Sequence, residues 1–60
     1  MESQADKQIA LQKAISNHEQ AEASIVDLQK DGANPAYTVL LERVQANLET
    51  LRADHAALAT

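Results

Sequence analysis

The only glycine and the only proline of the 60-residue chain lie close together at its centre, in the segment Asp31-Gly32-Ala33-Asn34-Pro35. Gly32 can adopt the left-handed backbone that closes a helix, and Pro35 cannot continue one. Asn34 is a favourable N-cap, and Pro35 suits the first position of a new helix. A single central break predicts an antiparallel helical hairpin, because a short connection turns the second helix back along the first.

The boundaries of this hairpin follow from the central break and from a start signal at Ser3. The segment Ser3-Gln4-Ala5-Asp6 has the spacing of a capping box, in which the serine hydroxyl accepts a backbone N–H and the acidic side chain reaches back. We predict one unit over residues 1–60, with a first helix at about 3–31, a turn at 32–34 and a second helix at about 35–59.

Apolar residues recur along both halves at alternating intervals of three and four, which is the spacing of a coiled-coil seam. The repeat runs from Leu11 to Leu28 in the first half and from Tyr37 to Leu58 in the second. Folding the chain about residue 33 pairs positions whose numbers sum to about 66, which sets His18 opposite Leu48. We expect a central layer of Leu11, Ile25, Leu28, Leu41, Val44, Leu48 and Leu51. The predicted interface residues are Leu11, Ala14, Ile15, His18, Ala21, Ile25, Leu28, Tyr37, Leu40, Leu41, Val44, Leu48, Leu51, His55 and Leu58.

A lone hairpin of this size has little capacity to bury two apolar stripes. A domain of 60 residues buries only about 60% of the surface that its unfolded chain exposes. The chain has no cysteine for disulfides, and Tyr37 is its only aromatic residue. We therefore expect an all-α protein, an antiparallel two-helix coiled-coil hairpin that assembles as a dimer into a four-helix bundle.

Charge narrows the range of partners. Nine acidic and five basic residues give a net charge of −4, without a block of one sign. Phosphate binding draws on clustered Lys and Arg, so nucleic acid is not an expected partner, although one locally basic face could still bind RNA. No run approaches the roughly 20 apolar residues that span a bilayer, and the first residues lack the pattern of a secretory signal. We expect a soluble, cytoplasmic protein without membrane contact.

His18 and His55 are the residues best suited to chemistry, and both fall within the apolar stripes. A di-iron bundle site needs Glu-x-x-His on facing helices, whereas Ile15 and Arg52 stand three residues before the histidines. His18 and Glu22 could supply half of a metal site, but the position favours a polar residue that sets register. If either histidine is buried in its neutral form, the dimer should lose stability as the pH falls from about 7 to 5.

No arrangement of residues supports catalysis. The serines and threonines lack a base placed by a recognisable motif, and a single glycine cannot build a phosphate-binding loop. The acidic pair Asp27 and Asp31 lies on a solvated face near the helix end. We predict that the chain is not an enzyme and has no catalytic residue, no metal and no cofactor.

Two resemblances bear on function. The length and the central turn resemble, in architecture alone, the small dimeric RNA-binding hairpins that regulate plasmid copy number. The segment Leu28-Gln29-Lys30-Asp31-Gly32-Ala33-Asn34-Pro35-Ala36, followed by Leu40, Leu41, Val44 and Leu48, resembles the turn and second helix of small hairpin subunits of type III secretion systems, both needle subunits and needle co-chaperones. The co-chaperone resemblance implies a hetero-oligomer in which the hairpin packs against helices of another protein.

The sequence thus predicts a non-enzymatic protein–protein interaction module, a small self-associating hairpin that acts as a regulator or adaptor. Its expected partner is a second copy or another helical protein. The alternatives are a co-chaperone that folds with a heterologous helical partner and a dimeric RNA-binding hairpin.

Overall fold

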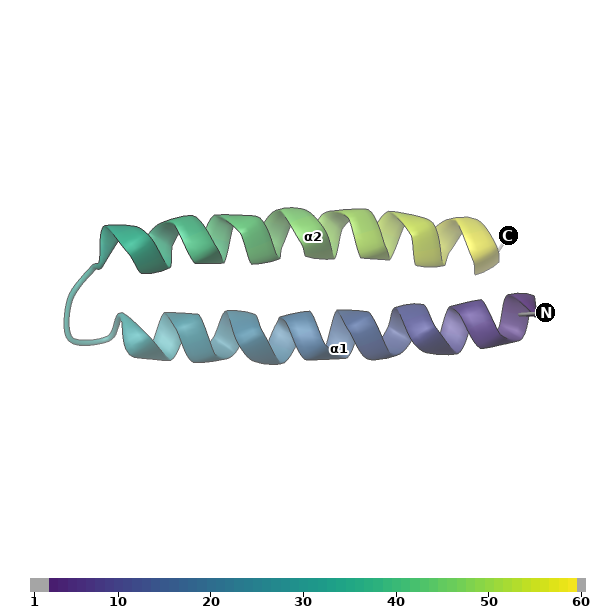
Figure 1. The fold of residues 1–60 in the computed structure, drawn as a ribbon, viewed down its shortest axis with the longest axis horizontal. Coiled ribbons are helices and arrows are strands. Elements are labelled where there is room, and N and C mark those ends of the chain that lie inside the picture. Colours follow the sequence, from purple (N-terminus) through teal and green to yellow (C-terminus); the bar gives the residue numbers. More distant parts are fainter. Residues whose placement is uncertain (1–2, 60) are drawn as a thin grey trace.

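The computed structural model describes residues 3–59, and these form two helices of equal length that pack side by side (Figure 1). Helix α1 covers Gln4–Leu28 and helix α2 covers Pro35–Ala59. The chain reverses between them, so both ends of the described chain lie at the end opposite the turn. The molecule is a rod of 45 × 17 × 14 Å. The all-helical hairpin expected from the sequence is confirmed for the described residues; the predicted unit also included residues 1, 2 and 60, which lie outside them.

The start of α1 is fixed by the capping box at Ser3. The backbone N–H of Asp6 donates to the Ser3 hydroxyl at 3.1 Å, and the backbone N–H of Ser3 donates to the Asp6 carboxylate at 3.4 Å. These two bonds satisfy donors that the first turn of a helix leaves without intrahelical partners. The capping box expected from the sequence is confirmed.

Helix α1 ends at Leu28, earlier than the predicted end near residue 31. After Leu28 the backbone tightens, because Gln29 donates to the carbonyl of Val26 at 3.1 Å and Lys30 donates to that of Asp27 at 3.2 Å. Such bonds between residues three apart are typical of a closing helix terminus. Gly32 then takes a φ of 152°, a positive value that side-chain-bearing residues rarely adopt. The connection therefore covers residues 29–34 rather than 32–34.

The start of α2 is held by Asn34 and by a side chain from the end of α1. The Asn34 side-chain oxygen accepts from the backbone N–H of Ala36 at 2.9 Å, which confirms the predicted N-cap. The side-chain oxygen of Gln29 accepts from the Asn34 backbone at 3.4 Å and from the Thr38 hydroxyl at 3.1 Å. Gln29 thus ties the end of α1 to the first turn of α2, a role that the sequence reasoning missed.

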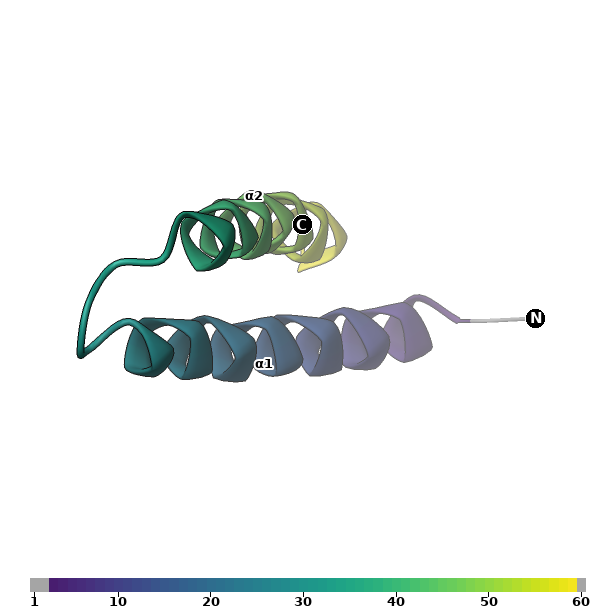
Figure 2. The ribbon, with the colours of Figure 1, turned by 60° about the vertical axis from the view of Figure 1, so that its left-hand side comes forward.

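The two helices do not run strictly parallel to each other. Seen from a second direction, α2 is foreshortened more than α1, so their axes are inclined (Figure 2). Inclined helices are closest along part of their length and separate toward the ends, as expected when ridges of side chains on one helix pack into grooves on the other.

Burial is concentrated on one side chain. Leu48 is 1% exposed and is the only buried residue among those whose burial is described. The other residues that line the contact between α1 and α2 are half-buried. A two-helix hairpin has no third element to cover these half-buried residues, so its core is limited to the single row of side chains between the two helices.

We expect Gly32→Ala to lower the free energy of unfolding by about 1–3 kcal/mol, because a Cβ at this backbone conformation is strained. No atom lies within 4 Å of the added Cβ, so crowding would not contribute. Asp31→Ala is the matched control, since no described residue other than glycine has a positive φ, and it should change stability by less than about 0.5 kcal/mol. Urea titration of both variants, followed by circular dichroism, measures the difference. Equal stabilities would contradict the strained turn.

Candidate functional site

The predicted interface residues fall into three groups in the hairpin. Leu48 is buried, and Leu28 and Leu40 are exposed. The remaining members are half-buried along the contact between the helices: Leu11, Ala14, Ile15, His18, Ala21, Ile25, Tyr37, Leu41, Val44, Leu51, His55 and Leu58.

Leu28 does not join the central layer to which the spacing assigned it. Its side chain is 60% exposed, and the next residue, Gln29, is half-buried instead. The contact line of α1 keeps a strict repeat of seven, but it runs through Gln8, Ile15, Glu22 and Gln29 together with Leu11, His18 and Ile25. Leu28 belongs to the neighbouring series of Ala14 and Ala21, and at the end of α1 it lies beside this line. Leu40, which the pattern placed beside the stripe of α2, is 45% exposed.

Three polar residues take places along the contact that the sequence reasoning did not foresee. Gln8, Glu22 and Gln29 are half-buried, and with Ile15 they recur every seven residues. The Nε2 of Gln8 donates to the backbone carbonyl of Leu58 at 3.2 Å. Carbonyls in the last turn of a helix have no intrahelical donor, so a long amide from the facing helix satisfies this one. The seven-residue spacing from Ile15 is the signal that could have identified these positions.

Cross-helix hydrogen bonds give the register of the hairpin. They join Gln4 and Gln8 to Leu58, Glu19 to Arg52, and Gln29 to Thr38. The residue numbers of these pairs sum to 62, 66, 71 and 67, which brackets the expected value of about 66. The predicted pairing of the two halves is confirmed to within about one helical turn.

The two sides of the hairpin differ in the size and charge of their residues. On one side α1 contributes a stripe of small residues that ends at Leu28, and α2 contributes leucines interspersed with Arg43, Asn47 and Asp54. The members of each stripe are spaced by three, four or seven and therefore share a helix face. We call this side the alanine flank. It consists of Ala10, Ala14, Asn17, Ala21 and Leu28 from α1 and Leu40, Arg43, Asn47, Leu51, Asp54 and Leu58 from α2.

The opposite side carries most of the charged and amide side chains next to the contact line. An ion pair crosses the helices there, with Arg52 and Glu19 at 3.3 Å, and both partners are more than half exposed. Such an exposed pair contributes little to stability. We call this side the charged flank. It consists of Gln8, Ile15, Glu19, Glu22 and Val26 from α1 and Thr38, Gln45, Glu49 and Arg52 from α2.

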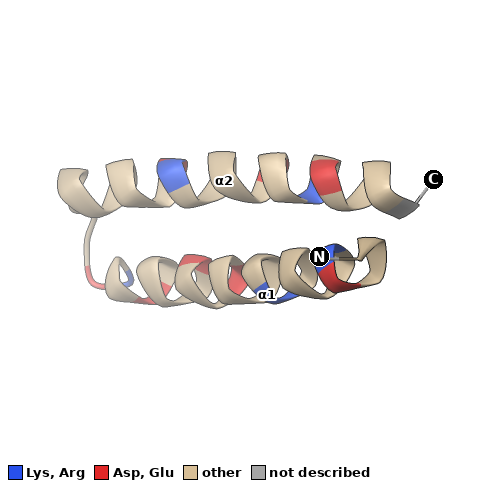
Figure 3. Cartoon of the chain, turned by 45° about the vertical axis from the view of Figure 1, so that its right-hand side comes forward, with Lys and Arg blue, Asp and Glu red and all other residues tan. Residues whose placement is uncertain are grey.

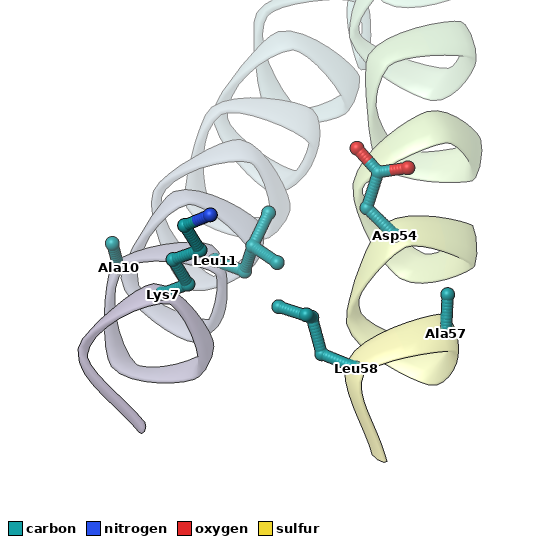
Figure 4. A pocket seen from close by; sticks show the side chains of 6 residues that line it. All are labelled: Lys7, Ala10, Leu11, Asp54, Ala57 and Leu58. Carbon is teal, nitrogen blue, oxygen red and sulfur yellow. The ribbon is translucent and has the colours of Figure 1, made fainter. Parts of the chain in front are cut away.

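A hollow of about 530 Å³ opens on the alanine flank near the chain ends. Leu11 and Leu58 point toward one another across the gap between the helices, and Lys7 and Asp54 reach out above them (Figure 4). Ala10 and Ala57 complete its lining. A smaller hollow of about 240 Å³ lies further along and is lined by His18, Asn47, Thr50 and Leu51. Because the larger hollow is lined by Ala10 from α1 and by Asp54 and Leu58 from α2, the two stripes of the alanine flank lie on the same side of the hairpin.

Neither histidine is buried in the hairpin. The Nδ1 of His18 lies 2.8 Å from the carbonyl oxygen of Ala14, a distance that fits donation by a protonated Nδ1. His55 is half-exposed, like His18. Among residues 3–59 no three or more His, Cys, Asp or Glu side chains gather as a metal site would require. The metal half-site considered from the sequence therefore has no third ligand within the described part of one chain.

Charged residues are distributed along both helices and do not collect into one patch (Figure 3). In the described part of the chain, neither helix has an apolar stretch long enough to cross a membrane.

Comparison of the chain with protein-family models, with curated proteins and with solved structures gives no match. The candidate site is therefore defined by geometry alone, as the alanine flank with its two hollows.

We expect Leu48→Ala to lower the free energy of unfolding by about 2–5 kcal/mol, because it removes the one fully buried side chain. Ile9→Ala is the control: the same class of truncation at a side chain that is 54% exposed should change stability by less than about 0.5 kcal/mol. Thermal unfolding monitored by circular dichroism compares the two variants. A loss of similar size in both would mean that Leu48 is not the centre of the packing.

Proposed function

We propose that the chain is a non-enzymatic protein–protein interaction module, a self-associating helical hairpin whose alanine flank is covered by another helical surface in its working state. The favoured assembly is a dimer that forms a four-helix bundle. In this assembly the module acts as a small adaptor or regulator that presents its charged flank to the surroundings. A cytoplasmic location belongs to the same proposal and rests on the sequence alone.

The observation that carries the proposal is the amount of surface left exposed. The hairpin exposes 4575 Å², whereas a compact monomer of its 6.5 kDa mass exposes about 3,800 Å². The difference, about 775 Å², is close to the roughly 800 Å² that each partner buries in a protein–protein interface of ordinary size. Covering one flank would bring the hairpin to the exposure typical of a folded chain.

The character of the two flanks supports the alanine flank as the covered one. It exposes Leu28 and Leu40, its α1 stripe has no charged residue, and its α2 stripe has two, Arg43 and Asp54. The charged flank has four charged residues: Glu19, Glu22, Glu49 and Arg52. Burying charged side chains without partners is costly, so an interface is more readily built on small and apolar residues than on the charged flank. Alanines at the contact also allow a second helix to approach closely.

The test is the state of association of the purified chain and of two matched variants. Leu40 and Val39 are neighbours with nearly equal exposure, 45% and 47%, but they lie on different faces of α2. We expect Leu40→Glu to raise the dissociation constant of the dimer by about tenfold or more, because it places an unpaired charge on the covered flank. Val39→Glu should change it by less than about twofold. Sedimentation equilibrium over a dilution series measures both.

Each result of this experiment has a defined meaning. A wild-type chain that stays helical and monomeric at all concentrations would overturn the self-association. A chain that is unfolded or aggregates alone, yet folds when mixed with a second helical protein, would instead favour the heteromeric function implied by the resemblance to type III secretion co-chaperones. Equal weakening by both glutamate substitutions would show that the alanine flank is not the surface used.

A further inference from the structure

We infer that the occupant of the alanine flank is a second copy of the same chain, docked face to face with its turn at the opposite end, so that α1 lies against α1 and α2 against α2. This inference rests on the self-association proposed above and adds the surface, the orientation and the register. The inference rests on pairs of surface features of one hairpin. The two members of each pair are complementary in shape or charge, but they lie too far apart to contact each other within one chain.

The first complementary pair is a protrusion and a hollow. Leu28 and Leu40 are exposed on the alanine flank near the turn, and the hollow of about 530 Å³ lies on the same flank near the chain ends. Leu40 and Ala57 are 17 positions apart on α2, about 26 Å along the axis. The two features can therefore meet only between two chains. When a second copy is reversed, the exposed leucines of each chain lie over the hollow of the other, and this happens twice by symmetry.

The second complementary pair is electrostatic. The ion pairs among residues 3–59 are Lys30–Asp27 and Arg52–Glu19, and neither uses Arg43 or Asp54. Arg43 and Asp54 occupy the outer edge of the alanine flank on the same face of α2, about 16 Å apart along the axis. Reversal of a second copy sets Arg43 of each chain opposite Asp54 of the other. Opposite charges at matching positions favour one register over its neighbours.

A single two-fold axis brings together both complementary pairs and also places the small residues of α1 opposite each other. The midpoints of Leu40 and Ala57, and of Arg43 and Asp54, both lie between residues 48 and 49. On α1 the half-buried residues Ala14 and Ala21 have their midpoint between residues 17 and 18. The cross-helix bonds join residues whose numbers sum to 62, 66, 67 and 71, so these two midpoints, which sum to 66, lie at the same level of the rod to within about one helical turn.

The axis passes close to the second, smaller hollow. Asn47 and Thr50, which line that hollow, lie on either side of the axis level, and Asn17 lies beside it on α1. Each of these polar side chains would thus be near its symmetry mate or the partner's other amide or hydroxyl group. Polar residues at the centre of a helical interface fix register, because a shifted alignment leaves them without hydrogen-bond partners.

A stack with both turns at the same end is less complementary. The two hollows would then face each other and leave a void, and the exposed leucines would meet leucines instead of a recess. Arg43 would lie at the level of its own copy in the partner, far from Asp54. A packed interface avoids voids of this kind, because their lining atoms lose contacts.

Engineered cysteines test the orientation, because the natural chain has none. Ala14→Cys and Ala21→Cys are made as separate variants, mixed in equal amounts and oxidised mildly. We expect a heterodisulfide as the main product of the mixture and severalfold less disulfide from either variant alone, since each introduced thiol lies about 10 Å along the axis from its own symmetry mate. Products are measured by non-reducing electrophoresis and mass spectrometry.

Ile15→Cys and Glu22→Cys form the matched control. These two residues have the same spacing as Ala14 and Ala21 and are also half-buried, but they lie one residue further along, on the charged flank. Disulfide from this pair in place of the alanine pair, or no heterodisulfide from either pair although sedimentation shows a dimer, would overturn the inferred docking and leave the interaction module standing. A wild-type chain that sediments as a monomer would overturn the proposed function together with the docking.

Discussion

Two helices packed side by side can hide from water only the side chains along their line of contact, because neither helix has a second neighbour. In this hairpin Leu48 alone reaches full burial among the residues whose burial is described, and the rest of the seam stays half-exposed. Cooperative stability in small domains comes mainly from buried apolar area, so a single buried leucine leaves the isolated hairpin with little reserve. The helix caps, the turn and the hydrogen bonds of the glutamine side chains therefore matter more to the stability of this hairpin than they would in a larger domain.

The features that the sequence predicted well are those set by local chemistry. The capping box at Ser3, the N-cap at Asn34 and the chain reversal depend on residues a few positions apart, so they can be read from spacing alone. The sequence predicts the end of α1 too late, because Gly32 marks the turn whereas the helix already tightens after Leu28. A helix can close several residues before the glycine that permits the reversal.

The features that the sequence did not reveal depend on how the two helices fit together in space. The apolar pattern assigns Leu28 to the central layer, but the contact line follows the neighbouring positions Ile15, Glu22 and Gln29, so Leu28 is exposed at its edge. The apolar pattern does not include Gln8, Glu22 and Gln29, because it assigns polar residues to the surface. The aliphatic part of such a side chain can nevertheless cover the contact between the helices while its polar end stays near solvent or a carbonyl. The large hollow arises from the spacing of two facing helices and leaves no mark in either stripe alone.

Hydrogen bonds across the hairpin join residues at very different separations along the chain. The Gln29–Thr38 bond near the turn spans nine residues, whereas the Gln8–Leu58 bond spans 50. Forming a contact between the two helices closes a loop of chain, and the entropy cost of closing it grows with the logarithm of its length. Contacts beside the turn close the shortest loops and therefore form first. Each contact that has formed then shortens the loop that the next contact must close. The rod should therefore assemble progressively from its turn, and the layers nearest the chain ends close last and open first. Amide hydrogens in those layers then exchange with solvent by local fraying, while those near the turn are protected for longer.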